Sequence, residues 1–364
     1  MEAPVKQLIE SLKNSREEIQ KYNALVGFDG FVDFIQRIIK TRDLSSFSYY
    51  STIEEFGHDV SAAAGKSGQF ELLNQEVKLG GNAPIMSNAL GHLGIHNYCL
   101  ASLGYPDLHP VFKHLHKNVE AISISEPGMT NALEFDDGKL ILSELSSFAL
   151  MDWPYLKQKS GVHLAEMISK SKLIALVDWA NINHANDIWK GIQTEILPKL
   201  TQAERIFFFD LCDPSKKSKE DLENILHTIS QYRLHGKVVL GMNENEANKI
   251  YQQLFPVTTV TPSLAEKGKL IFQYLNIDLL LIHPVDRALG IHNEGIVEVQ
   301  GKLVLKPKIS TGGGDNFNAG LCLGLMLNLS LEESMLAGIA TSGSYVSHGY
   351  SPDVDGIIRY LEEW

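Results

Sequence analysis

The chain of 364 residues contains little cysteine, and its three cysteines, Cys99, Cys212 and Cys322, are far apart in the sequence. They form no Cys-x-x-Cys pair, so we expect neither a disulfide framework nor a cysteine-based zinc site. The sequence also lacks a run of about twenty apolar residues, which a membrane-spanning helix would need. The charged residues that follow Met1 are unlike a signal peptide. These absences predict free thiols, no membrane partner and a cytoplasmic location.

Positive charge is also scarce, because 32 Lys and Arg residues face 44 Asp and Glu residues and leave a net charge of −12. Such an excess of negative charge disfavours nucleic acid or an anionic membrane as the main partner. The hydrophobic share of 44% is ordinary for a folded protein and allows a sizeable core. If this protein handles phosphates, backbone amides, Mg²⁺ or a few basic side chains must concentrate the positive potential locally.

Short apolar runs alternate with longer amphipathic segments over most of the chain, which predicts parallel strands joined by helical crossovers. The predicted strands are residues 24–28, 98–103, 173–177, 206–209, 238–240 and 279–282. An amphipathic helix is predicted at residues 5–22, and a hairpin around residues 293–295. Because no low-complexity linker interrupts the alternation, we expect one α/β domain that covers residues 1–364.

Two segments depart from the alternation. Residues 36–79 are more polar and irregular in composition, and Asp137-Gly138 is a strong hairpin signal between apolar flanks. We expect both segments to project from the α/β core as a lid, with approximate bounds of 34–79 and 122–147.

The most informative stretch contains three consecutive glycines, Gly312, Gly313 and Gly314, followed by Asp315. An apolar run comes next, which predicts a helix that begins at the glycines. Amides at a helix N-terminus point toward bound phosphate, and the helix dipole favours the negative charge. A carboxylate adds no favourable charge there, so Asp315 is expected to accept a proton from a hydroxyl that attacks the phosphoryl group. The alternative is a glycine-rich turn that only starts a buried helix.

This stretch resembles the late signature of the PfkB or ribokinase-like carbohydrate kinases, in the part Gly312-x-Gly314-Asp315-x-Phe317. The resemblance implies a ribokinase-like three-layer α/β/α core with a mostly parallel sheet and a small β lid. It also implies a sugar kinase that transfers the γ-phosphoryl group of ATP to a carbohydrate hydroxyl. Asp315 would be the general base, and Gly312–Gly314 the anion hole.

The signature departs from the family at its start. Ile309 stands where the family has an aspartate that helps to bind a monovalent cation, and Ser310 replaces a threonine. A requirement for potassium is therefore doubtful in this protein.

Two earlier motifs resemble the sugar-binding part of the family. Asp33 follows the first predicted strand, and ligands of α/β proteins bind beyond the carboxyl ends of strands. Its carboxylate could accept two sugar hydroxyls, although Asp29 is a nearby competitor and a solvated turn aspartate is the alternative. Gly80-Gly81-Asn82 resembles the Gly-Gly signature that contacts the sugar, and the alternative for Asn82 is a helix cap.

Asn243 and Glu246 follow the strand at 238–240 and match the family's Asn-x-x-Glu motif. An amide and a carboxylate three residues apart share one face of a helical turn. Because Mg²⁺ keeps several of its waters, the two side chains are expected to orient the hydrated ion through water. The alternative is an ordinary capping box at the start of a helix.

The nucleotide pocket is where the resemblance is weakest, because His283 and Val285 replace the family's Thr-x-Gly segment. Thr311 and Arg287 are the remaining candidates for nucleotide contacts, and a surface salt bridge is the alternative for Arg287. ATP is the expected donor through the resemblance alone. ADP stays open, because ADP-dependent relatives share the fold and the Gly-x-Gly-Asp segment.

Other functions remain open beside the sugar kinase. A nucleoside or vitamin-alcohol kinase of the same fold is one alternative, and a non-catalytic sugar- or nucleotide-binding regulator is another. The presence of Asp315 favours a kinase over the regulator, since a protein that only binds needs no base. The sequence does not identify the acceptor, and the resemblance also allows a homodimer formed through the lid.

Overall fold

The computed structural model describes residues 3–256 and 261–364, and its largest element is a nine-stranded sheet. The strands of this sheet are β1 (Asn23–Gly27), β5 (His96–Ala101), β6 (Val119–Ser123), β9 (Leu173–Leu176), β10 (Ile206–Asp210), β11 (Lys237–Met242), β12 (Leu279–Ile282), β13 (Arg287–His292) and β14 (Gly295–Gln300). Their order is β14-β13-β12-β11-β10-β9-β1-β5-β6. Pairing is parallel from β6 to β12, whereas β13 and β14 pair in antiparallel fashion at one edge.

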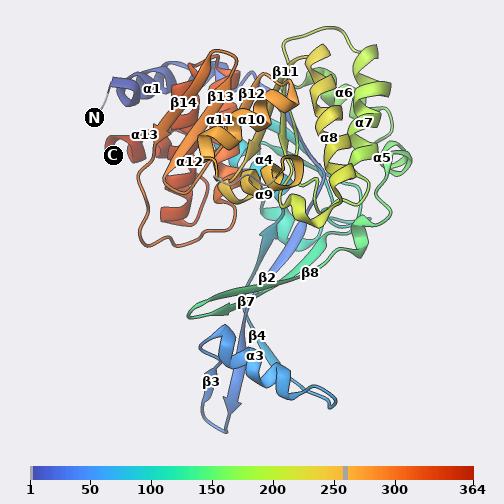
Figure 1. Cartoon of the computed structure of the whole chain (residues 1–364), viewed down its shortest axis with the longest axis vertical. Helices are drawn as coiled ribbons and strands as arrows, with labels where there is room; N and C mark the ends of the chain where they lie inside the picture. The colour runs from blue at the N-terminus through green and yellow to red at the C-terminus, as the bar shows by residue number, and fades with distance from the viewer. Residues whose placement is uncertain (1–2, 257–260) are drawn as a thin grey trace.

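Helices cover both faces of this sheet (Figure 1). One layer contains α1 (Ala3–Asn14), α4 (Asn82–His92), α11 (Gly313–Met326), α12 (Leu331–His348) and α13 (Val354–Glu362). The other contains α5 (Trp153–Ser160), α6 (His163–Lys170), α7 (Ala185–Gly191), α8 (Lys219–Gln231), α9 (Glu244–Leu254) and α10 (Leu264–Leu275). Successive side chains of a strand point to opposite faces, so Leu25 packs in the second layer and Val26 in the first. The three-layer α/β/α prediction is confirmed.

Short irregular turns complete the α/β core. The helix α2 (Arg16–Ile19) follows α1, turns of 3₁₀ type lie at Pro110–His114, Ser146–Phe148, Leu197–Lys199, Pro214–Lys216 and Tyr232–Leu234, and a π turn lies at Ile192–Ile196. No helix among residues 3–256 and 261–364 is long and apolar enough to cross a membrane.

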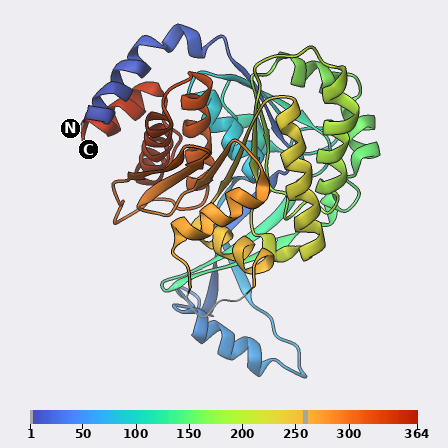
Figure 2. The ribbon, with the colours of Figure 1, turned by 45° about the horizontal axis from the view of Figure 1, so that its top comes forward.

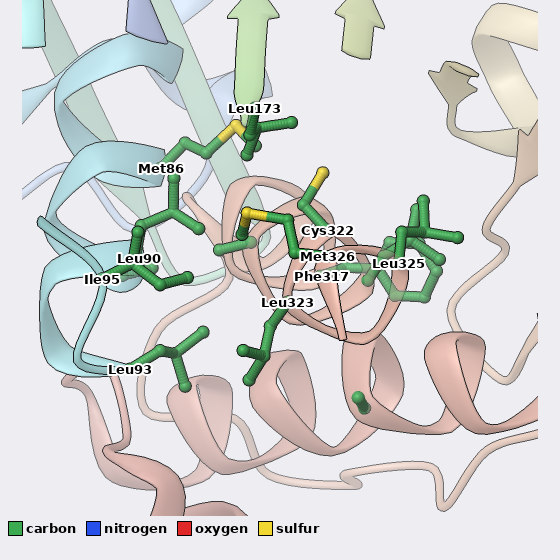
Figure 3. Close-up of a cluster of buried hydrophobic side chains, with 14 of the residues drawn as sticks. Met86, Leu90, Leu93, Ile95, Leu173, Phe317, Cys322, Leu323, Leu325 and Met326 are labelled. Atoms are coloured by element: carbon green, nitrogen blue, oxygen red, sulfur yellow. The ribbon is translucent and has the colours of Figure 1, made fainter. Parts of the chain in front are cut away.

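Helix α11 is buried along nearly its whole length, and from Ala319 onward it is apolar on all sides. It packs between α4 and α12, and Figure 3 shows side chains of α4 and α11 meeting in the core. Met86 of α4 and Met326 of α11 are both fully buried there. A helix that is hydrophobic all round is stable only in such an interior position. The glycine run at its N-terminus is therefore attached to the most fully buried helix of the first layer.

A second sheet projects from the core as an arm (Figures 1 and 2). Its strands are β2 (Phe31–Arg42), β3 (Phe47–Tyr49), β4 (Glu71–Gly80), β7 (Gly128–Phe135) and β8 (Gly138–Glu144), and the helix α3 (Ile53–Ala62) lies against it. The order is β3-β2-β7-β8, and β4 also pairs with β2. We call this arm the lid. Its small core is built around Ile38, Tyr50, Leu133 and Phe135.

The predicted strands of the core and both hairpins are present, but two local expectations were wrong. The helix predicted at 5–22 is broken at Ser15, whose hydroxyl donates to the carbonyl of Ser11 and separates α1 from α2. Residues 36–79 are not irregular, because they contain most of β2 together with β3, α3 and β4. Most side chains of β4 are exposed, so its sequence lacks the apolar alternation of a half-buried strand.

Candidate functional site

The carboxyl ends of the parallel strands bring a group of acidic side chains together. We call this group the acid cluster, and its members are Asp29 after β1, Asp178 after β9, Asp210 at the end of β10, Glu246 in α9 and Asp315 in α11. The four aspartates are each less than 10% exposed. Parallel strands present their carboxyl ends at one edge of the sheet, where ligands of this fold class bind.

Asp315 lies where the charges of the acid cluster converge. Burial raises its pKa well above the usual carboxyl range, and the negative charges of the other four acids add to the shift, Asp210 most strongly. A carboxylate with a raised pKa holds a proton firmly once it has accepted one. This position is therefore suited to general-base chemistry.

The glycine run shapes the N-terminus of α11. Gly312 is the N-cap residue and has a φ of +88°, a left-handed conformation that favours glycine. A Cβ atom on it would lie 2.9 Å from the hydroxyl of Tyr345, which donates to the carbonyl of Thr311 at 3.0 Å. The amide of Gly313 donates to the carbonyl of Ser310 at 3.3 Å. Of the three predicted amide donors, Gly313 is thus already engaged within the loop.

The two glycines of the Gly80-Gly81 pair each make room for a carboxylate. A Cβ atom on Gly80 would clash with the carboxyl group of Asp33, and one on Gly81 would lie 2.6 Å from Oδ2 of Asp29. Asp29 accepts hydrogen bonds from the amides of Asn82 and Ala83 at 2.6 and 2.8 Å, so it serves as the cap of α4. Both carboxylate oxygens of Asp29 are thus engaged by the N-terminus of α4.

Asp33, by contrast, lines a cavity of about 240 Å³ at the base of the lid. Lys78, Thr311 and Tyr345 also line this cavity, which we call the lid-base cavity. Burial raises the pKa of Asp33, while the charge of Lys78 opposes the shift. Asp33 and Asp29 were the two candidates for the sugar-binding aspartate. The structure places Asp33 at a cavity and Asp29 at the N-terminus of a helix.

Asn82 does not cap α4, because Gly81 is the N-cap residue and Asn82 the first residue of the helix. The capping alternative for Asn82 is therefore wrong. Its side-chain oxygen instead accepts a hydrogen bond from the thiol of Cys212 at 3.4 Å. The thiol has a raised pKa because of burial and the nearby negative charges of the acid cluster, so it stays protonated as a donor.

Asn243 and Glu246 form a capping box, which was the alternative to a magnesium role in the sequence analysis. The side chain of Asn243 accepts from the amide of Glu246 at 2.9 Å, and the carboxylate of Glu246 accepts from the amide of Asn243 at 2.8 Å. Burial first and the charge of Asp210 second raise the pKa of Glu246 to about 8. A nearby cation would stabilise the ionised form of Glu246. The capping box is therefore compatible with a role in magnesium binding, which stays a prediction.

The donor set around Glu246 fits a hydrated ion. Among residues 3–256 and 261–364, no three His, Cys, Asp or Glu side chains are arranged to hold a metal ion directly. Carboxylate and amide oxygens that act through retained waters are the usual environment of Mg²⁺ beside phosphates. Glu246, Asp210 and Asn243 supply these oxygen types at one edge of the sheet.

A larger cavity of about 340 Å³ opens on the other side of the glycine run, and we call it the outer cavity. It is lined mainly by apolar groups and by His283, whose ring stacks on Phe317 at a centroid distance of 4.7 Å. Burial lowers the pKa of His283 to about 4, so its ring is neutral. Arg287 also lines this cavity, although it pairs with Asp286 at 3.1 Å and Glu298 at 3.5 Å.

The structure brings most of the predicted residues together, but Thr311 lies at a different cavity from the one we expected. Thr311, which we expected beside the nucleotide, lines the lid-base cavity with Asp33, whereas its neighbour Ser310 lines the outer cavity. Sequence reasoning missed Asp178 and Asp210. Both directly follow predicted strands, and Asp33 was selected because it lies beyond the end of a predicted strand, so the same rule could have found them.

The model of the prokaryotic ketohexokinase family matches residues 2–364. The chain belongs to this family. A ketohexokinase of Haloferax volcanii is 25% identical over an alignment of 364 positions, which covers 98% of this chain and 96% of that relative. As a member of the prokaryotic ketohexokinase family, the chain is a carbohydrate phosphotransferase, and the sequence-based assignment to the ribokinase-like kinases is confirmed.

Solved structures of low sequence identity share the fold of this family member. A ribokinase of Arabidopsis thaliana complexed with ribose and ATP is 14% identical, with a TM-score of 0.62 and coverage of 94% of this chain and 99% of that one. A putative ribokinase II of Escherichia coli in complex with ATP and Mg²⁺ is 9% identical, with a TM-score of 0.63 and coverage of 94% and 99%.

Proposed function

We propose that this protein transfers the γ-phosphoryl group of ATP to a hydroxyl of a ketohexose. The observation that carries the proposal is the match of the ketohexokinase family model to residues 2–364, in a chain that retains Asp315 behind the glycine run. The named activity of the Haloferax volcanii relative supports a ketohexose as acceptor. The ATP and Mg²⁺ in the two ribokinase-fold complexes support the donor.

The two cavities suggest how the substrates are arranged. The lid-base cavity offers the carboxylate of Asp33 and the hydroxyl of Thr311, groups that suit the hydroxyls of a sugar. The outer cavity is large enough for a base or ribose and has an apolar lining with Arg287 at its rim. In this arrangement, the glycine run between them holds the phosphates, and Thr311 belongs to the acceptor side.

Asp315 would receive the proton of the attacking hydroxyl. Its raised pKa makes it an effective base when ionised, and its burial excludes water from the same position. The free amides at the start of α11 would stabilise the charge that develops on the phosphoryl oxygens. Mg²⁺, held through water near Asn243 and Glu246, would neutralise part of the donor's phosphate charge.

The test is a coupled turnover assay with Mg²⁺ and a panel of ketohexoses, aldohexoses, pentoses and nucleosides, with ATP or ADP as donor. We expect turnover with ATP and a ketohexose, and no increase when potassium is added, because Ile309 replaces the cation-binding aspartate. Preference for a nucleoside would move the acceptor to the alternative kinase class. Sugar or nucleotide binding by calorimetry without any turnover would support the regulator instead.

We also propose that two lids pair to form a homodimer. Ile141 and Leu142 of β8 and Met129 of β7 are between 43% and 59% exposed, so the lid carries apolar side chains that the described residues leave uncovered. Sedimentation analysis should give a dimer, and replacement of Ile141 and Leu142 by serine should give a monomer. A wild-type monomer at micromolar concentration would contradict the pairing.

A further inference from the structure

Lys139 is held at a fixed place by the rest of the lid. It is the second residue of β8 and directly follows the turn of the β7–β8 hairpin. The carboxylate of Asp136 in this turn pairs with Arg37 at 2.9 Å, and that of Asp137 accepts from the amide of Ile53 at 3.0 Å. Lys139 therefore moves with the lid as a whole rather than with a loose loop.

The ammonium group of Lys139 reaches the loop that precedes the glycine run. Its Nζ donates to Oγ1 of Thr311 at 3.2 Å, across 172 residues of sequence. Thr311 comes directly before Gly312, and its carbonyl is held by Tyr345. A positive charge of the lid thus lies beside the N-terminus of α11.

Lys139 forms no salt bridge with the residues that the structure describes. Its hydrogen-bond partner is the neutral hydroxyl of Thr311. Arg287 of the outer cavity differs, because two carboxylates engage it. The charge of Lys139 also acts on the carboxyl group of Asp33. Lys139 is consequently close both to the carboxyl group of Asp33 and to the residue that precedes the glycine run.

We propose that Lys139 is a catalytic residue that binds an oxygen of the phosphoryl group while that group moves from donor to acceptor. The inference rests on the proposed kinase function. The acceptor oxygen forms a bond to the γ-phosphorus, the bond to the bridging oxygen breaks, and its electron pair stays on the nucleoside diphosphate. The acceptor's proton goes to Asp315. Lys139 remains protonated, and the hydroxyl of Thr311 holds its ammonium until the phosphoryl group is present.

The surroundings explain why a cation from the lid is useful here. The acid cluster places five carboxyl groups next to the site, and those that are ionised repel the negatively charged phosphoryl group during its transfer. A cation carried by the lid arrives only when the lid covers the site. Transfer to water from an open site is then disfavoured, because the open site lacks this charge.

The experiment compares Lys139→Met and Lys139→Arg with the wild-type chain in the ketohexose assay. Lys139→Met should lower kcat about 100-fold and leave the KM values of sugar and nucleotide within about two-fold, as expected for a charge used in the transition state. Lys139→Arg should retain most of the activity, because it keeps the charge. Calorimetry with ADP, aluminium fluoride and ketohexose should show that Lys139→Met weakens binding of this phosphoryl mimic but not of ATP.

Lys66→Met is the matched control, because Lys66 is an exposed lysine of the same lid outside both cavities. Its kcat should equal that of the wild type. Unchanged kcat in Lys139→Met, or a rise in the sugar KM alone, would overturn the role of Lys139 and leave the kinase function standing. Absence of turnover in the wild-type chain would overturn the kinase function and the role of Lys139 with it.

Discussion

The N-terminus of α11 and the lid hairpin meet at Thr311, yet they are built in opposite ways. Helix α11 is buried on all sides, and Asp315 in its first turn is surrounded by other carboxylates. The hairpin β7–β8 belongs to a thin sheet with a small core, and its exposed turn directly precedes Lys139. The rigid part supplies the negative groups and the outlying part a positive one. In the proposed mechanism, this division lets lid closure complete the charge balance of the site.

Replacement of Asp315 by asparagine should have the largest effect, because it removes the base from the rigid side and keeps the shape. We expect kcat to fall about 10³-fold while the sugar dissociation constant changes little. Steady-state kinetics and calorimetry check this. Asp187→Asn, on the exposed surface of α7, is the control. Normal turnover by Asp315→Asn would contradict the assignment of the base.

Replacement of Gly312 by alanine should have a smaller effect, of about ten-fold in kcat. Its φ of +88° strains any side chain, and a Cβ atom would press on the hydroxyl of Tyr345. The control in the lid is Gly57→Ala in α3, where a Cβ atom meets nothing within 4 Å. That variant should keep wild-type turnover. Equal activity of both alanine variants would show that the glycine run need not keep its backbone shape.

The pH dependence should distinguish the two regions further. Burial and mutual repulsion raise the pKa of Asp210 to about 6 and of Glu246 to about 8, so these groups favour the folded state when protonated. The stability they contribute is present at low pH and is lost as pH rises through these values. We expect the melting temperature of the ligand-free protein to fall as pH rises from about 4, the usual carboxyl pKa, to about 8, as thermal unfolding would show.

Matched variants test the source of this slope. Asp210→Asn should flatten the part of this slope below about pH 6, where the folded and unfolded states differ in the protonation of Asp210. Asp43→Asn in the lid should not, because hydrogen bonds from Ser45 and Ser46 lower the pKa of Asp43 to about 2, far from this range. Activity should change in the opposite direction and rise with pH as Asp315 ionises. A melting temperature that does not change over this interval would contradict the electrostatic account of the acid cluster.

The smallest effect on global stability is expected from the core of the lid. Leu323→Ala in α11 should lower the free energy of unfolding by about 2–5 kcal/mol, because the cavity cannot collapse in a closely packed interior. Leu133→Ala should loosen the lid locally and leave the main transition nearly unchanged. Hydrogen exchange together with chemical denaturation separates the two cases. Equal losses of global stability would mean that lid and core unfold as one unit.

Much of the core could be predicted, because its parallel strands are buried on both faces and appear in the sequence as continuous apolar runs such as 206–209. The strands and the helix within residues 36–79 could not be predicted, because most side chains of β4 are exposed. Its sequence therefore shows no alternation of apolar and polar residues. Asp178 and Asp210 directly follow predicted strands, so the rule that ligands bind beyond the carboxyl ends of strands could have identified them. Lys139 had no local signal, because its contact with Thr311 depends on how the lid is placed over the core.

A double-mutant cycle in the ketohexose assay tests most directly whether the rigid aspartate and the lid lysine act on one phosphoryl group. It compares the kcat of the wild type, Asp315→Asn, Lys139→Met and the double variant. Groups that act together in one transition state are not additive, so the double variant should be hardly slower than Asp315→Asn alone. Losses that multiply would show that the two residues act independently and would contradict the account.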